Sequence, residues 1–280
     1  MARTKSFSPA TKVIPASATT VVVWTPSEID SAGVVLLTMA VAATAGAFTI
    51  GNCTAVAVKA NGVTVLNCTL TQLLAYQERW SPKGASDAAT GRVLNIPLNK
   101  LGAAGGDDEE DLCQFMPGAT ITVEATFVTG AGVSGTAMLG WTKTTIEPRY
   151  YLTLLRQPMN VAANQTNARV PIGAQGLVEG IGIVTAALGQ VRAIVSGFEV
   201  MNQPGVLYNG AANQGDMLQA SEALWDAPDD ASQITTFMFS KFGQGLQANP
   251  ATSWLEVTTG AGFNVADECV IFSVVPIVQG

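Results

Sequence analysis

Short hydrophobic runs recur along the whole chain, and residues that favour turns separate them. Most runs are about five to ten residues long and rich in valine, threonine and alanine, which is typical of extended strands. Long helical stretches do not alternate with them, which favours an antiparallel sandwich or barrel over a parallel α/β fold. The predicted strands are residues 19–24, 33–41, 54–59, 63–66, 119–128, 136–142, 177–185, 192–201, 235–239, 254–259 and 268–275.

Two segments have the hydrophobic spacing of a helix instead. The first spans residues 69–80, and its first residues, Thr69 and Gln72, match a Thr-x-x-Gln capping box. The second spans residues 213–225 and has hydrophobic residues three to four positions apart. We therefore expect one short helix in each half of the chain.

Each predicted helix ends at a tryptophan, Trp80 in the first half and Trp225 in the second. We expect both side chains to anchor their helices against a sheet, and stacking on a carbohydrate is the alternative role. A strand–turn–strand block precedes each helix, with Gly62 and Gly205 at corresponding turns. The glycines are 143 residues apart and the tryptophans 145, which predicts a tandem duplication with a period of about 144 residues.

The duplication predicts two domains of similar size. Residues 13–147 form the first and residues 148–280 the second, joined by a short linker at 144–149. Residues 1–12 precede the first hydrophobic run and are predicted to be a separate N-terminal arm.

The amino-acid composition argues against several classes of function. The chain is 48% hydrophobic but only 12% charged, about half the roughly 25% of an ordinary soluble domain, which suits a surface covered by other copies or by a membrane. The uncharged run between Asp30 and Lys59 is broken by turn residues and is predicted to form two strands instead of a transmembrane helix. A net charge of −7 argues against sequence-specific nucleic-acid binding. The absence of histidine excludes Ser-His and Cys-His catalysis, so we expect no enzyme.

The cysteines have no Cys-x-x-Cys spacing, so metal or redox sites are not predicted. A hairpin turn at Asn61-Gly62 would place Cys68 opposite Ala55 and offset from Cys53. We therefore expect buried thiols outside any disulfide, in a chain made in a reducing cytoplasm. The cysteines are Cys53, Cys68, Cys113 and Cys269.

Two acidic segments stand out. Residues 107–111 are all acidic and follow a glycine-rich stretch, so a solvated loop is the favoured interpretation; ion binding through Asp108 and Glu110 is the alternative. After the second helix, a smaller acidic group is either another exposed loop or a contact with a neighbouring subunit. It consists of Asp226, Asp229 and Asp230.

The layout of the two blocks, residues 56–80 and 195–225 with the linker at 144–149, resembles the double jelly-roll major capsid proteins of tailless icosahedral phages with an internal membrane, of the corticovirus and finnlakevirus type. The resemblance implies an all-β fold of two tandem antiparallel jelly-roll sandwiches, each with one short helix. It also implies homotrimers of pseudo-hexameric outline that tile an icosahedral shell, and a virion protein made in the host cytoplasm.

The same resemblance implies partners and no cofactor. The partners would be other copies, penton or minor capsid proteins, and a lipid membrane beneath the shell. In such proteins the N-terminus tends to lie on the inner side. The arm carries three basic residues, Arg3, Lys5 and Lys12, before the first acid, and Ser and Pro interruptions argue against regular structure. We therefore expect an extended arm that contacts lipid or an adjacent chain.

Two other functions compete with the shell protein. A receptor- or carbohydrate-binding β-sandwich module, such as a phage spike or adhesin, would need exposed aromatic residues, which are only 7% of this chain. A jelly-roll hydrolase with paired carboxylates would need two isolated acids on matched strands, and none stands out.

Overall fold

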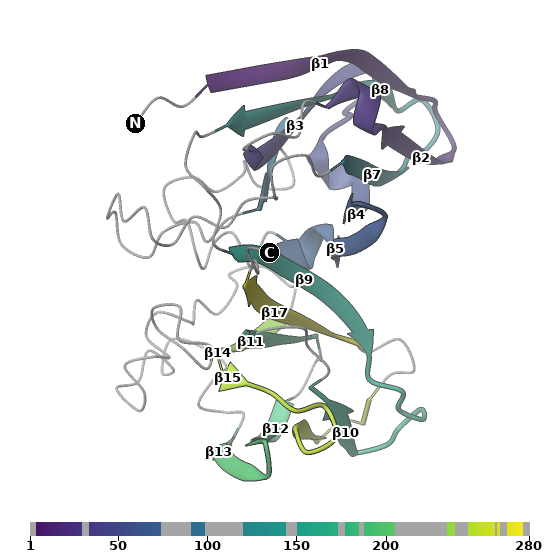
Figure 1. Ribbon diagram of the computed structural model, residues 1–280. Helices are drawn as coiled ribbons and strands as arrows, with labels where there is room; N and C mark the ends of the chain where they lie inside the picture. Colours follow the sequence, from purple (N-terminus) through teal and green to yellow (C-terminus); the bar gives the residue numbers. More distant parts are fainter. Residues whose placement is uncertain are drawn as a thin grey trace. The chain divides into compact units, whose positions relative to one another are not determined.

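Antiparallel β-strands form almost all of the regular structure (Figure 1). The computed structural model describes residues 4–29, 34–73, 91–98, 120–143, 150–172, 177–184, 188–204, 234–238, 246–260, 262–263 and 268–276. The chain divides into two compact units. Unit 1 contains Met1–Leu152 and Pro276–Gly280, and unit 2 contains Thr153–Val275.

Two four-stranded sheets build unit 1. One has the order β1-β8-β3-β6 and the other contains β5-β4-β7-β2. Strands distant in sequence alternate within each sheet, and this is the strand order of a jelly roll. The strands are β1 (Thr4–Ile14), β2 (Thr19–Trp24), β3 (Val34–Ala45), β4 (Cys53–Ala60), β5 (Val63–Thr69), β6 (Val93–Pro97), β7 (Ile121–Val128) and β8 (Ser134–Lys143), with short 3-10 turns η1 (Pro26–Glu28) and η2 (Ile50–Asn52).

Unit 2 repeats this order strand for strand. Its sheets contain β14-β11-β17-β9 and β10-β16-β12-β13, and β15 pairs with β11. The predicted all-β fold of two tandem jelly rolls is thereby confirmed. The strands are β9 (Tyr150–Pro158), β10 (Asn167–Pro171), β11 (Leu177–Val184), β12 (Leu188–Val195), β13 (Phe198–Pro204), β14 (Ile234–Met238), β15 (Leu246–Gln247), β16 (Trp254–Thr259) and β17 (Glu268–Pro276).

Equivalent hairpins correct the predicted alignment of the two halves. The β4–β5 turn has Asn61 and Gly62 at φ 49° and 81°, and the β12–β13 turn has Ser196 and Gly197 at φ 51° and 84°. These turns are 135 residues apart, so Gly62 corresponds to Gly197 and the alignment with Gly205 is wrong. Residues 192–201 are likewise not one strand, because the Ser-Gly pair bends the chain there.

Each hairpin also contains a bulge at the same place. In both, two residue pairs follow the turn and then the register shifts by one residue, between Val58 and Lys59 in unit 1 and between Ala193 and Ile194 in unit 2. The shift moves Cys68 from its predicted partner to Val56. A two-residue turn alone does not reveal such a bulge, so the predicted pairing with Ala55 is wrong.

The first predicted helix begins as expected. Residues 70–73 are helical, the backbone N–H of Thr69 donates to Gln72 Oε1 (2.9 Å), and that of Gln72 donates to Thr69 Oγ1 (3.2 Å). The capping box is therefore confirmed. The rest of this helix to Trp80, and all of residues 213–225 with Trp225, lie outside the described residues.

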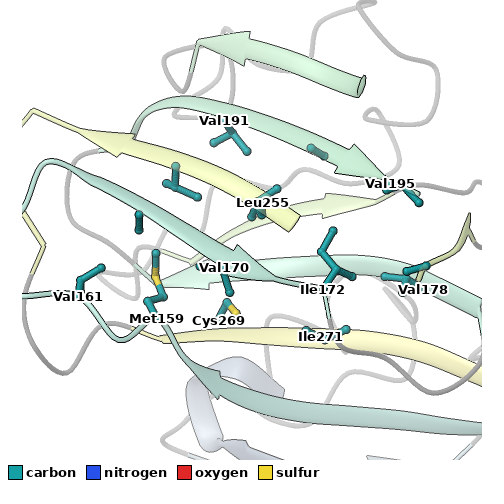
Figure 2. Close-up of a cluster of buried hydrophobic side chains, with 14 of the residues drawn as sticks. Met159, Val161, Val170, Ile172, Val178, Val191, Val195, Leu255, Cys269 and Ile271 are labelled. Carbon is teal, nitrogen blue, oxygen red and sulfur yellow. The ribbon is translucent and has the colours of Figure 1, made fainter. Parts of the chain in front are cut away.

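Each unit buries its own hydrophobic core between its two sheets. In unit 1, Trp24, Phe48 and Phe127 are almost fully buried, and the last two rings lie 5.7 Å apart. In unit 2, Met159, Val191 and other inward residues fill the sandwich (Figure 2). Burial of such aliphatic and aromatic side chains is the main stabilising contribution to either unit. Within the described residues, no helix is long and apolar enough to span a bilayer.

Candidate assembly surfaces

The N-terminal segment is a strand, so the prediction of an irregular arm at residues 1–12 is wrong. Strand β1 pairs with β8 from Thr4 to Ile14, and a register shift between Phe7 and Thr11 absorbs the Ser8-Pro9 interruption. The side chain of Ser8 accepts a hydrogen bond from the backbone of Ala10 within this bulge (3.1 Å). Pro in a strand signals an edge or a bulge as well as a break, and here it marks both.

The three basic residues of this segment have different surroundings. Lys12 forms an ion pair with Glu28 (2.7 Å), and this bond holds the pKa of the Glu28 carboxyl below its usual value. Lys5 is exposed on β1, and Arg3 lies outside the described residues. Lys12 therefore fastens β1 to η1 within unit 1.

The outer face of the β1-β8-β3-β6 sheet is almost uncharged. We call it the neutral face. Alternate residues of the four strands point away from the core, and Lys5 is the only charged residue among them. Its described members that remain accessible are Lys5, Phe7, Thr11, Val13, Leu36, Thr38, Ala40, Ala42, Val93, Asn95, Thr136 and Met138.

Phe7 is the largest accessible side chain on the neutral face. It is 59% exposed, and its ring lies over Gly140 of β8, where an added Cβ would come within 2.5 Å of the ring. A glycine beneath an aromatic ring lets the ring lie flat against the strand. The same face carries Val13, 70% exposed, and Met138, 36% exposed. These residues are large for a solvent-facing position.

The outward surface of the β10-β16-β12-β13 sheet of unit 2, which corresponds to the β2-β7-β4-β5 sheet of unit 1, is charged. We call it the charged face. The guanidinium of Arg169 lies 3.6 Å from the centre of the Trp254 ring, and the indole N–H of Trp254 donates to Glu256 Oε1 (2.9 Å). Arg192 bonds Glu256 (3.1 Å) and Glu199. The network spans all four strands of the sheet.

Electrostatics within the charged face are balanced. The hydrogen bond from Trp254, helped by Arg192, keeps the pKa of the Glu256 carboxyl below its usual value. Glu199 and Glu256 in turn raise the pKa of Arg192. Two cations and two carboxylates thus neutralise one another while they stay accessible to water. Arg169 covers one face of the Trp254 ring.

The outward side of the β5-β4-β7-β2 sheet of unit 1 carries fewer charges than the charged face and more than the neutral face. It has one ion pair, Lys59 Nζ to Glu124 Oε1 at 2.6 Å, and three exposed valines. The valines are Val21 (57% exposed), Val23 (36%) and Val128 (45%).

The described cysteines are buried thiols that form no disulfide. Burial raises the pKa of Cys53 and of Cys269 to about 12, so both remain protonated at neutral pH and are poor nucleophiles. The prediction of buried thiols is confirmed for Cys53, Cys68 and Cys269, and Cys113 lies outside the described residues.

The remaining predicted sites lie outside the described residues. This holds for the acidic segment with Asp108 and Glu110 and for Asp226, Asp229 and Asp230. Among the residues that are described, no three histidine, cysteine or acidic side chains cluster closely enough to hold a metal ion.

Sequence reasoning missed both outer faces. The neutral face needs β1 to be recognised as a strand, and residues 4–14 have no alternation of hydrophobic and polar residues that would indicate one. The charged face joins residues that are distant in sequence, such as Arg192 and Glu256, and no local pattern predicts that contact.

Comparisons with known proteins place the fold. No family model matches the chain, and no curated protein matches it. Major capsid protein P2 of bacteriophage PM2 aligns with a TM-score of 0.67 at 12% identity, over 99% of this chain and 98% of that one. The major capsid protein of Sulfolobus turreted icosahedral virus (STIV) aligns with a TM-score of 0.65 at 10% identity, over 98% and 96% of the two chains.

A chain in the atomic structure of the same archaeal virus gives a TM-score of 0.64 at 9% identity, over 97% of this chain and 90% of that one. At sequence identities this low, the structural likeness shows the fold alone. The strand order found independently in each unit agrees with the alignment over nearly the full length. The chain has the double jelly-roll fold of these major capsid proteins.

Proposed function

We propose that the chain is a major capsid protein that assembles into an icosahedral viral shell. The observation that carries the proposal is the full-length likeness to two viral major capsid proteins, with both jelly rolls present. A charge content of 12% supports it, because a surface with few charges is better suited to burial between subunits than to exposure. The role is structural, with no catalytic step and no cofactor.

The assembly we propose is a homotrimer. Three chains with two similar jelly rolls each would place six similar sandwiches in a ring, which gives a pseudo-hexameric unit that can tile a shell. Subunit interfaces in such an obligate assembly should exceed about 2,000 Å². The chain would be made in the host cytoplasm, which suits its buried thiols, and would reside in the virion.

Further partners belong to the same proposal. Penton or minor capsid proteins would close the shell where trimers cannot, and a lipid membrane would lie beneath it. Arg3 is proposed to face the particle interior, and Lys5 is not included because it belongs to the neutral face. Lys12 is not included, because its ion pair with Glu28 already neutralises it.

Size measurement tests the function. Light scattering coupled to size exclusion should give three times the 29.0 kDa chain mass, and negative-stain micrographs should show larger particles. A monodisperse monomer at high concentration would contradict the proposal. Binding to a glycan array without any higher assembly would favour the adhesin alternative.

A further inference from the structure

We propose that the neutral face of unit 1 is a subunit interface whose occupant is a second copy of this chain. The inference rests on the proposed capsid function and adds to it the surface by which one copy meets another.

The low charge of the neutral face indicates which class of partner it can bind. Along β1, β8, β3 and β6, the accessible outward side chains include one cation, Lys5, and no acid. Such a face has too few cations for a nucleic-acid backbone or an anionic lipid surface, and no carboxylate for a basic peptide. Its complement is another weakly charged protein surface. This chain, with 12% charged residues, supplies that surface in every copy.

Exposed hydrophobic side chains form a continuous stripe on the face. The β1–β8 register places Phe7 opposite Gly140, Thr11 opposite Met138 and Val13 opposite Thr136. Phe7, Met138 and Val13 therefore follow one another along the same strand pair. An accessible aromatic ring beside aliphatic side chains is the composition of an interface centre.

Polar groups on the same face argue against a bilayer as the occupant. Thr38 Oγ1 donates to Asn95 Oδ1 (3.2 Å), and Thr136 is also accessible. Hydroxyl and amide groups placed in hydrocarbon lose hydrogen bonds to water, whereas a protein partner can replace those bonds. Small residues such as Ala40 lie between these polar groups. Because their side chains are short, another sheet can pack closely against this face.

The face is ready for binding without rearrangement. Phe7 is held over Gly140, and the four strands are joined by antiparallel pairing. Little conformational freedom is then lost when the interface forms, which favours tight association.

Matched valine substitutions test the inference. Val13→Lys puts a charge into the neutral face, while Val63→Lys puts one on a valine of similar exposure at the β4–β5 turn (70% and 59%). We expect Val13→Lys to raise the concentration needed for half-maximal association at least tenfold and Val63→Lys to leave it unchanged. Circular dichroism and thermal unfolding should show that both variants are folded.

A second variant and a photochemical probe keep the test independent of strand β1. Met138→Glu changes the centre of the face on β8 and should weaken association in the same way. A benzophenone amino acid at position 138 should, in assembled wild-type-like protein, form a covalent product joining two copies of the chain. Peptide mapping would then identify the partner segment.

The outcomes separate this inference from the proposed function. If the unsubstituted chain never associates, the capsid proposal fails and the interface fails with it. If the chain assembles, both face variants assemble normally and the probe joins no second copy, the interface is wrong while the capsid proposal stands. Capture of lipid by the probe would also overturn the second copy as the occupant.

Discussion

The two units share a backbone plan and differ in what they present to the outside. Their hairpins β4–β5 and β12–β13 have the same turn and the same bulge, and their sheets have the same strand order. Unit 1 nevertheless has a neutral face with exposed Phe7 on its β1-β8-β3-β6 sheet, whereas the equivalent sheet of unit 2, β9-β17-β11-β14, carries an ion pair between Arg156 and Glu268 (2.7 Å). The two units therefore share apolar inward residues and a strand order, and they differ in their outward residues.

Packing explains why the backbone plan persists. Inward positions in both units hold large apolar side chains in a closed core, and any replacement there changes the packing. Outward positions meet water or partners, so they accept side chains of different kinds. Trp254 on β16 and Thr122 at the equivalent position of β7 are one example. Substitutions at outward positions should therefore change the association between copies, and substitutions at inward positions should change the free energy of unfolding.

Removal of residues 2–12 should have the largest effect on this comparison. The deletion takes away most of β1, exposes the edge of β8 and breaks the Lys12–Glu28 pair. We expect unit 1 to lose cooperative unfolding while unit 2 keeps it, as two-dimensional NMR or limited proteolysis followed by mass spectrometry would show. Deletion of residues 2–3 alone is the control and should leave both units folded. An intact unit 1 after the longer deletion would contradict the assigned role of β1.

Core truncations on equivalent strands come next. Phe127 on β7 is fully buried, and so is Leu255 on β16. Phe127→Ala should lower the free energy of unfolding by about 3–5 kcal/mol and Leu255→Ala by about 2–5 kcal/mol, because each leaves a cavity. Urea titrations followed by intrinsic fluorescence would measure both. Val21→Ala, at an exposed position of unit 1, should change stability by less than about 0.5 kcal/mol.

Features set by neighbouring residues could be predicted from the sequence, whereas features set by pairing between distant strands could not. The capping box of Thr69 and Gln72 and the Asn61-Gly62 turn are local, and the structure confirms both. Strand β1 was missed because its pairing with β8 overrides the local effect of Pro9. The bulge that shifts Cys68 was missed for a similar reason, since register beyond the turn is set by packing across the sheet.

Paired glycine substitutions should have smaller and equal effects in the two units. Gly62 and Gly197 have φ values of 81° and 84°, and an added Cβ would meet nothing within 4 Å at either site. The cost of Gly→Ala is then backbone strain alone, about 1–2 kcal/mol in each unit. Chemical denaturation of Gly62→Ala and Gly197→Ala would check this. Costs that differ by more than about 1 kcal/mol would show that the two turns are not energetically equivalent.

The smallest effect should come from Glu256→Gln, measured against pH. The pKa of Glu256 is lowered in the folded chain, first by the Trp254 indole N–H and then by Arg192, so ionised Glu256 favours the folded state. This contribution is fully present above the unfolded pKa of 4.5 and is lost as the pH falls through the lower folded value. Glu256→Gln should therefore reduce stability slightly at pH 7 and flatten its decline below pH 4.5. Glu124→Gln in unit 1 is the matched control, on the corresponding strand and in an ion pair with Lys59. Thermal unfolding from pH 3 to 7 would compare the variants, and an unchanged acid slope in Glu256→Gln would show that the charged face does not stabilise unit 2.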